Sequence, residues 1–393
     1  MKKVVRNTIA ILALSAFVFT SCSDDDTTQN NNNTENPGEN PGGSDFVINV
    51  NDFKGTISNG TVTLDATKEY KLTGSLIVGN GAKLVIPAGT KIIGTGGTSA
   101  YIAVAQGGKI EVNGTATNPV VMTGAQQTPG NWGGLVICGK APINKGNTAT
   151  AEVSELTYGG SDANDNSGSI KYLRIEYAGA NFNSEKEFNG LSLFGVGKGT
   201  TIEYVQLHEG SDDGIEFFGG TVNTKYIVSS HNEDDAFDWT EGWNGTNEYW
   251  FGKQTTTAGN RGIEADNNSN NHTASPISNP TIKNVTLIGR GNTGDEPQAF
   301  KLRVGTFANL DNIVISNWNV GFDVQHDESI NAIGTTLKAT NVKFVNVNEK
   351  SKGKKTDNST VDVSALYTEN NNATGAGNGT QTPTWAQGWT VGL

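Results

Sequence analysis

Cysteine, charge and helical periodicity are scarce in this chain of 393 residues, and each shortage excludes a class of protein. Only two cysteines occur, Cys22 and Cys138, so a disulfide framework is excluded. Charged residues make up 17% of the chain and the formal net charge is −12, which argues against binding nucleic acid or an anionic membrane surface. After residue 21, no apolar run approaches the roughly 18 residues that a membrane-spanning helix needs.

Glycine, by contrast, is abundant, and its 50 residues break the chain into short β-branched runs typical of strands and turns. Six five-residue segments align without gaps, each with a small residue followed by apolar residues at alternate positions: 190–194, 214–218, 236–240, 262–266, 299–303 and 321–325. Their starts lie 22 to 37 residues apart, which is the repeat length of a solenoid. A second set of strands, once per repeat, is expected at 170–175, 202–207, 282–287 and 310–315.

The front of the chain carries a related pattern, with GSLIVGNGAKLVIPAGTKI from residue 74, GGKIEVNGTATNPVVMTG from residue 107 and WGGLVI from residue 132. This pattern resembles the opening coils of the right-handed parallel β-helix, or pectin-lyase-like, superfamily. The resemblance covers about residues 70 to 350 and implies an all-β, single-stranded right-handed parallel β-helix (solenoid) with polar loop insertions. The same scaffold carries lyases, hydrolases, esterases and adhesins, so it does not indicate one activity.

The N-terminal residues predict where in the cell the protein is located. Residues 1–21 have a basic start and an apolar run, as a signal peptide does. The ending Phe-Thr-Ser-Cys resembles a lipobox, which implies lipidation of Cys22, and the acidic residues 24–26 resemble the export tag of lipoproteins on the outer face of the outer membrane. An ordinary cleaved secretion signal is the alternative.

Composition then divides the rest of the chain. Residues 22–45 are polar and predict a flexible tether, and residues 46–350 predict the β-helix. Residues 351–393 combine a polar segment with two tryptophans, which we expect to form a C-terminal cap over the last coil. Cys138 ends an apolar strand and is expected to be a buried, inert thiol.

The third column of the six segments points outward and is mostly charged: Ser192, Glu216, Asp238, Glu264, Lys301 and Asp323. Coils in register stand about 4.8 Å apart, where two like charges repel by roughly 3.5 kcal/mol at an effective dielectric of 20. A cation, a shared proton or the nearby Lys301 and Arg303 would have to offset this repulsion. The fifth column, at the turn side, adds Phe218, Asp266 and Arg303.

The bends before these strands are also acidic. Asp212, Asp213, Asp234 and Asp235 occupy matching places in adjacent repeats and predict calcium ligands, with turn capping as the alternative. His208 and His231 recur in register too, but a zinc site would require them to converge.

Aromatic residues near this surface suggest a carbohydrate platform. Residues 243–261 read as a polar insertion, so Trp243 and Trp250 are expected either to stack on a sugar or to pack within a loop.

These features together favour a protein that binds a glycan in an acidic, aromatic-edged groove, with calcium as a candidate cofactor. The groove would use Glu216, Phe218, Trp243, Trp250, Asp266 and Asp323 as ligand-binding residues.

One alternative is an enzyme working in the same groove. A polysaccharide lyase would use Lys301 or Arg303 as base, and a glycoside hydrolase would use Asp238 and Glu264. The chain lacks the Arg-x-Pro-x-x-Arg pattern of calcium-dependent pectate lyases and the Asn-Thr-Asp, Gly-Asp-Asp and Arg-Ile-Lys set of polygalacturonases. The other alternative is an accessory or adhesive lipoprotein that partners an outer-membrane transporter.

Overall fold

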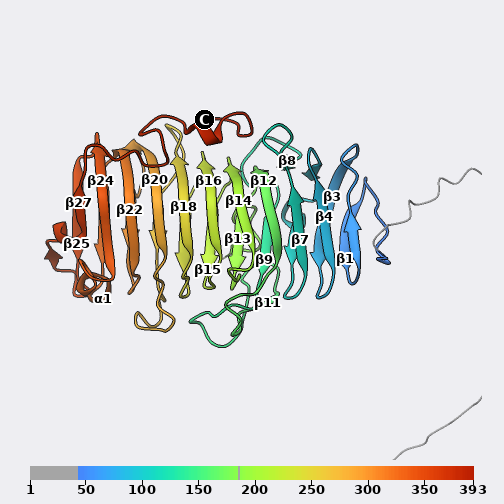
Figure 1. Cartoon of the computed structure of the whole chain (residues 1–393), viewed down its shortest axis with the longest axis horizontal. Coiled ribbons are helices and arrows are strands. Elements are labelled where there is room, and N and C mark those ends of the chain that lie inside the picture. The colour runs from blue at the N-terminus through green and yellow to red at the C-terminus, as the bar shows by residue number, and fades with distance from the viewer. Residues whose placement is uncertain (1–42, 185) are drawn as a thin grey trace, which may run out of the picture. The chain divides into compact units, whose positions relative to one another are not determined.

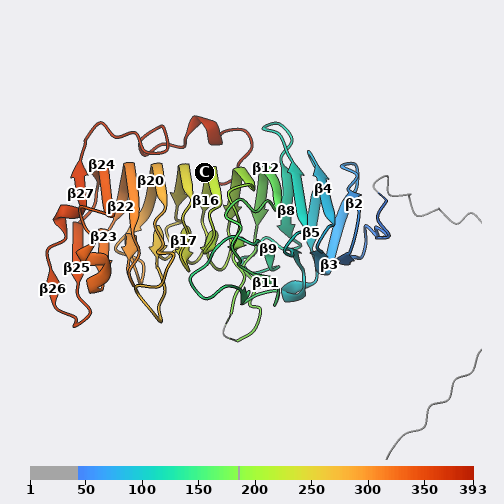
Figure 2. The ribbon, with the colours of Figure 1, turned by 60° about the horizontal axis from the view of Figure 1, so that its bottom comes forward.

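A computed structural model describes residues 43–184 and 186–393, and nearly all of them coil into a parallel β-helix. Twenty-five strands form one continuous, mostly parallel sheet around a shared core, while β10 (Ala149–Thr150) and β11 (Thr157–Tyr158) form a separate antiparallel pair. Figures 1 and 2 show the coils stacked in chain order. The right-handed parallel β-helix predicted from the sequence is confirmed.

Each coil supplies strands to three faces. The first and second faces are joined by long strands that bend at a corner: β12 (Gly168–Glu176), β14 (Thr201–His208), β16 (Asn223–Ser230), β18 (Thr246–Lys253), β20 (Thr281–Gly291), β22 (Ala308–Trp318) and β24 (Leu337–Val345). In the earlier coils the first face holds β2 (Thr61–Thr63), β4 (Lys83–Pro87) and β7 (Lys109–Asn113), and the second holds β5 (Lys91–Gly94) and β8 (Val120–Gly124).

The third face carries one short strand per coil and positions the candidate site. Its strands are β1 (Phe53–Ile57), the end of β3 (Glu69–Val78), β6 (Tyr101–Val104), β9 (Gly134–Cys138), β13 (Leu191–Phe194), β15 (Ile215–Phe218), β17 (Phe237–Thr240), β19 (Ile263–Ala265), β21 (Gln298–Leu302), β23 (Val320–Gln325) and β25 (Glu349–Lys354). The six segments aligned from sequence coincide with the strands from β13 to β23.

The core fills the space inside the three faces with stacked apolar columns. Ile215, Phe237 and Ile263 lie on successive coils of the third face in direct register, and all are fully buried. Trp250 stacks on Phe237 at 4.5 Å between ring centroids. Such columns stabilise each coil mainly through its two neighbours, as expected for a solenoid.

The corner between the first and second faces is built from residues with a left-handed backbone. Tyr172, Tyr204, Tyr226 and Tyr249 have φ of 50° to 61°, and their rings stack with centroids 4.3–5.0 Å apart. Each left-handed tyrosine costs about 1–2 kcal/mol, which the ring stacking of about 0.5–1.5 kcal/mol per pair partly offsets. Asparagines, which tolerate this conformation better, take over the corner in the later coils.

The C-terminal end is closed by residues 351–369, where β26 (Thr360–Val361) and η2 (Ser364–Leu366) cover the last coil with Val363 and Leu366 buried in the main core. β27 (Tyr367–Glu369) pairs with β24, so the helix continues past the predicted boundary at residue 350. Two other short helices, α1 (Asp327–Asn331) and η1 (Gly97–Ser99), lie in turns between strands.

The prediction that the two C-terminal tryptophans cap the last coil is wrong. Residues 370–393, the C-terminal strap, run back over the outside of the second face and contain η3 (Thr384–Ala386) (Figures 1 and 2). Trp389 packs edge-on against Tyr172 and Tyr204, because the stacked tyrosine rings of the corner form an apolar surface that the strap can cover.

The predicted leader 1–21, Cys22 and nearly all of the tether 22–45 lie outside the described residues. Within residues 43–184 and 186–393, no helix has the length and apolar character needed to cross a bilayer.

Candidate functional site

The outward column of the third face forms the charged ladder that the sequence predicts. Glu216 pairs in register with Asp238, and Asp238 with Glu264, on β15, β17 and β19. Ser192 precedes them, and Lys301 and Asp323 continue the column.

A second polar column stands immediately before the small residue of the first five repeats, and only its two aspartates were recognised from the sequence. It reads Asn189, Asp213, Asp235, Arg261 and Gln298, and all five are buried. Oδ1 of Asp213 accepts the backbone N–H of Asp235 at 2.9 Å, and Oδ1 of Asp235 accepts that of Arg261 at 2.6 Å. The aspartates therefore cap the turns, as the alternative interpretation held.

The two columns together make a continuous acidic strip, defined here as Asp213, Glu216, Asp235, Asp238 and Glu264. Ligand oxygens of Asp213, Glu216 and Asp238 lie within 4.8 Å of one another, and those of Asp235, Asp238 and Glu264 do likewise. Asp238 belongs to both groups and is the centre of the strip.

Burial and mutual repulsion favour the protonated form of these carboxyls. Burial, then the neighbouring carboxyls, raises the pKa of Asp213, Glu216 and Asp238 well above its usual value. The pKa of Asp235 rises to about 8, mainly through burial, although Arg261 lowers it. Asn189 donates to Oε2 of Glu216 at 2.8 Å. Either retained protons or a bound cation would relieve the repulsion within the strip.

Arginines close one end of the strip. Nη1 of Arg261 lies 3.1 Å from Asp235 and 2.7 Å from Glu264, and Nη2 of Arg303 lies 2.5 Å from Glu264. Glu264 has a raised pKa, through burial first, and these two arginines oppose the rise. Charge on the strip is therefore compensated at Glu264 and least compensated around Asp238.

The predicted catalytic bases are engaged in ion pairs. Nζ of Lys301 lies 2.5 Å from Glu296, and Arg303 also contacts Asp266 at 2.8 Å. Burial lowers the pKa of Arg303, but Asp266 and Glu264 outweigh it and raise the pKa, whereas a proton-abstracting base needs a depressed one. The structure therefore does not support the lyase role given to Lys301 and Arg303; both act as counter-charges.

Two predicted ligand-binding acids are also paired. Asp266 is held by Arg303, and Asp323 is buried and lies 3.3 Å from Lys352. Because the pairs satisfy both carboxylates, neither is free to bind a ligand in the way that the sequence predicted.

The turn acids converge only in part. Asp212, Asp213 and Asp234 bring ligand oxygens within 4.8 Å of one another, but Asp235 points to Arg261 and Glu264 instead. Burial and then Asp234 raise the pKa of Asp212 to about 7, and Oδ1 of Asp234 accepts a hydrogen bond from Asn260 at 2.8 Å. Three of the four predicted calcium ligands therefore share one cluster.

The prediction that Trp243 and Trp250 form an aromatic platform for a sugar beside the strip is wrong. Trp243 and Trp250 are fully buried, and Trp243 stacks on Phe217 at 3.9 Å. The stretch read as a polar insertion contains β18, a regular strand whose Tyr249 occupies the left-handed corner and so turns Trp250 inward. Neither indole can meet a sugar.

Phe218 is covered as well, being only 5% exposed. It stacks on Phe194 at 4.0 Å beneath residues 139–160, which pack Ile143 and Tyr158 onto the outside of the third face. This loop, which carries β11 in Figure 1, therefore covers the outside of the third face at Phe218. Cys138 lies in the same cluster and is buried, as expected.

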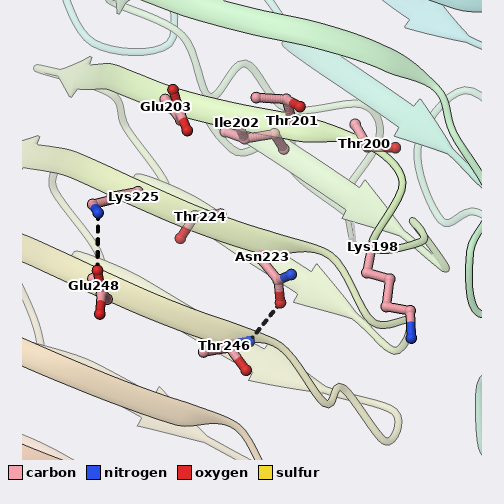
Figure 3. Close-up of a pocket in the computed structure, with 10 residues that line it drawn as sticks. All are labelled: Lys198, Thr200, Thr201, Ile202, Glu203, Asn223, Thr224, Lys225, Thr246 and Glu248. Carbon is pink, nitrogen blue, oxygen red and sulfur yellow. Dashed lines mark hydrogen bonds and ion pairs between the residues drawn. The ribbon is translucent and has the colours of Figure 1, made fainter.

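A cavity on the first face is a weaker candidate for a binding or catalytic site than the acidic strip. Figure 3 shows Glu203, Lys225 and Glu248 along a depression between coils, where Lys225 and Glu248 pair at 3.0 Å and Asn223 accepts the backbone N–H of Thr246 at 2.7 Å. Its charges neutralise one another on an open surface, so the strip remains the stronger candidate.

Comparisons with known proteins bear on the fold. A family described as pectate-lyase-like β-helix domain matches residues 55–390. No curated protein matches the sequence. Among solved structures, full-length tailspike protein 2 of Escherichia coli O157:H7 bacteriophage CAB120 is 12% identical over 72% of this chain and 35% of the tailspike chain, with a TM-score of 0.24. A likeness that low carries no argument about function. The family match spans most of the chain, and the chain belongs to the pectate-lyase-like β-helix domain family.

Proposed function

We propose that this protein binds a polysaccharide along the outer side of the third face, with the acidic strip as its contact. The observation that carries the proposal is the uninterrupted run of carboxyls through Asp238, which follows the helix axis with one rung about every 4.8 Å. Carboxylates accept strong hydrogen bonds from hydroxyl groups, and a row of them can engage several sugars of one chain. Membership of a pectate-lyase-like family agrees with a polysaccharide ligand.

Calcium is the proposed cofactor of this contact. Carboxyl oxygens within 4.8 Å of one another repel when ionised, and a hard cation with six to eight oxygen ligands removes that cost. Asp213 and Asp238, with Glu216 beside them, could hold such an ion and leave positions for sugar oxygens. Because the nearby aromatic rings are buried, we expect capture to depend on charge and hydrogen bonds rather than on stacking.

A second candidate is hydrolysis of the bound polysaccharide, and the raised pKa values favour it. A glycoside hydrolase needs one carboxyl that keeps its proton and another that is ionised, and coupled carboxyls such as Glu216 and Asp238 can divide these roles. This assignment moves the catalytic pair from Asp238 and Glu264, because Glu264 is tied to two arginines.

The location is proposed from the N-terminal sequence alone. Lipidation at Cys22 would anchor the protein to the outer membrane, with the β-helix held outside the cell by the tether 22–45. An adhesive or transporter-associated lipoprotein remains the alternative from another class.

One experiment separates these functions. The protein is incubated with a panel of acidic and neutral polysaccharides, with calcium or with chelator, and retention, new reducing ends and unsaturated products are measured. Calcium-dependent retention without products supports binding, and new reducing ends support hydrolysis. Asp238→Asn should abolish retention, whereas Asp311→Asn on the first face should leave it intact. Equal retention by both variants would place the site elsewhere.

A further inference from the structure

The corner between the second and third faces brings together two of the four histidines of the chain and one glutamate. His208 ends β14 and is followed by Glu209, while His231 directly follows the end of β16 in the next coil. His208 pairs in register with Ser230, so Glu209 and His231 occupy the same corner position, and both have a left-handed backbone with φ of 51° and 64°. The fold therefore stacks these side chains on one another.

Their ligand atoms lie slightly farther apart than the ligands of a small metal ion. Nε2 of His208 lies 3.6 Å from Oε1 of Glu209, and Nδ1 of His231 lies 3.9 Å from the same oxygen. All three ligand atoms lie within 4.8 Å of one another. A tetrahedral ion with bonds of about 2.0–2.1 Å holds its ligands about 3.4 Å apart, so small side-chain adjustments would close this set around one ion.

A supporting contact orients His208. Its Nδ1 lies 2.9 Å from Oγ of Ser230, which is fully buried and also accepts a hydrogen bond from Gln206 at 3.0 Å. When Nδ1–H donates to Ser230, the lone pair of Nε2 faces Glu209, which is the arrangement of a metal-ligating histidine with an outer partner.

His231 is partly exposed, whereas His208 is buried. His231 also lines a cavity of about 440 Å³ together with Gln254, Lys253 and Arg290, so an ion would reach the site past two cationic side chains.

We propose that His208, Glu209 and His231 form a binding site for a divalent transition-metal ion, with Zn²⁺ as the ion that fits best. Two imidazoles and one carboxylate are a set that zinc sites use, and three protein ligands leave a fourth position open, as in catalytic rather than structural zinc sites. The site is separate from the acidic strip, whose all-oxygen donors suit calcium instead. It stands whether or not the protein binds a polysaccharide.

The test measures Zn²⁺ binding to the full chain by competition with a chromogenic chelator at pH 7.5, with calcium in excess to occupy the strip. We expect one Zn²⁺ per chain, and loss of more than about tenfold in affinity in each of Glu209→Gln and His231→Ala. Ser230→Ala should weaken binding by about 10-fold, less than either ligand variant, because it removes only the orienting partner. Circular dichroism checks that each variant is folded.

Two matched controls fix the location. His272→Ala alters the other histidine pair of the chain, in which His272 contacts Glu328 at 2.9 Å, and Asp238→Asn alters the strip; both should bind Zn²⁺ as the wild type does. Co²⁺ in place of Zn²⁺ should give the intense visible absorption of a tetrahedral ion, and His231→Ala should lose it. The proposal would be overturned if the wild type does not bind Zn²⁺ tightly, or if Glu209→Gln and His231→Ala both keep Zn²⁺ binding. Loss of Zn²⁺ binding in Asp238→Asn would also overturn it.

Discussion

Asp238→Asn should stabilise the protein in the absence of calcium, because Asp238 is the point at which both halves of the acidic strip meet. After burial, each of the neighbours that most strongly affect its pKa is another carboxyl, beginning with Glu216 and Glu264, and each raises it. Asparagine has nearly the same shape but no charge to acquire, so it relieves the strip without leaving a cavity.

The size of the effect follows from proton linkage. The folded pKa of Asp238 lies above its unfolded value of 3.8, so its contribution to stability is fully present below pH 3.8 and declines as pH rises toward the folded pKa. While the folded group keeps its proton, the decline is about 1.4 kcal/mol per pH unit. Because Asp238 retains some contact with water, we expect Asp238→Asn to stabilise the fold by about 1–2 kcal/mol, which raises Tm by about 1–3 °C.

The assay is thermal unfolding of wild type and Asp238→Asn in chelator at pH 4.5 and pH 7.5. The Tm of the variant should exceed that of the wild type at pH 7.5, and the difference should shrink at pH 4.5. Asp323→Asn is the matched control from the same column, and it should lower Tm because Asp323 is paired with Lys352. If Asp238→Asn lowers Tm as much as Asp323→Asn does, the carboxyls of the strip do not repel and the reasoning fails.

Three further changes test other parts of the account. Trp389→Ala removes the buried ring that fastens the strap, should cost about 3–5 kcal/mol, and should make residues 370–393 the first segment to exchange amide hydrogens. Arg261→Met leaves two strip carboxylates, Asp235 and Glu264, without their counter-charge and should destabilise the protein by about 3–5 kcal/mol at pH 7.5. The loss should be smaller at pH 4.5, where the carboxyls are protonated. An equal loss of stability at both pH values would refute the ion-pair role. Cys138 should stay unreactive toward a thiol reagent in the folded protein, because burial raises its pKa to about 12; rapid labelling would contradict its burial.

The coils could be predicted from the sequence because a β-helix repeats its inward-facing columns of residues in register. Aligning Gly214–Phe218 with Ala236–Thr240 placed Glu216 beside Asp238, as the structure does. A further alignment was available but was missed: a tyrosine followed by an apolar residue recurs at 172, 204, 226 and 249. That pattern marks the left-handed corner and would have placed Trp250 in the core.

The rest of the site depends on contacts between segments distant in sequence. Phe218 is buried because residues 139–160 fold over it, and no local pattern indicates where that loop lands. Arg261 neutralises part of the strip because it stands one coil after Asp235, at the position before the small residue, where aspartate occurs in the two preceding coils. The strap was misplaced for the same reason: its tryptophans are apolar, but their partners are the corner tyrosines rather than the last coil.

The most direct test of the central claim is a crystal structure of the protein with calcium and an oligosaccharide cut from a polymer that it retains. We predict an ion among Asp213, Glu216 and Asp238, with sugar density along the outer side of the third face. Sugar density in the first-face depression of Figure 3, with the strip free of both ion and sugar, would contradict the account.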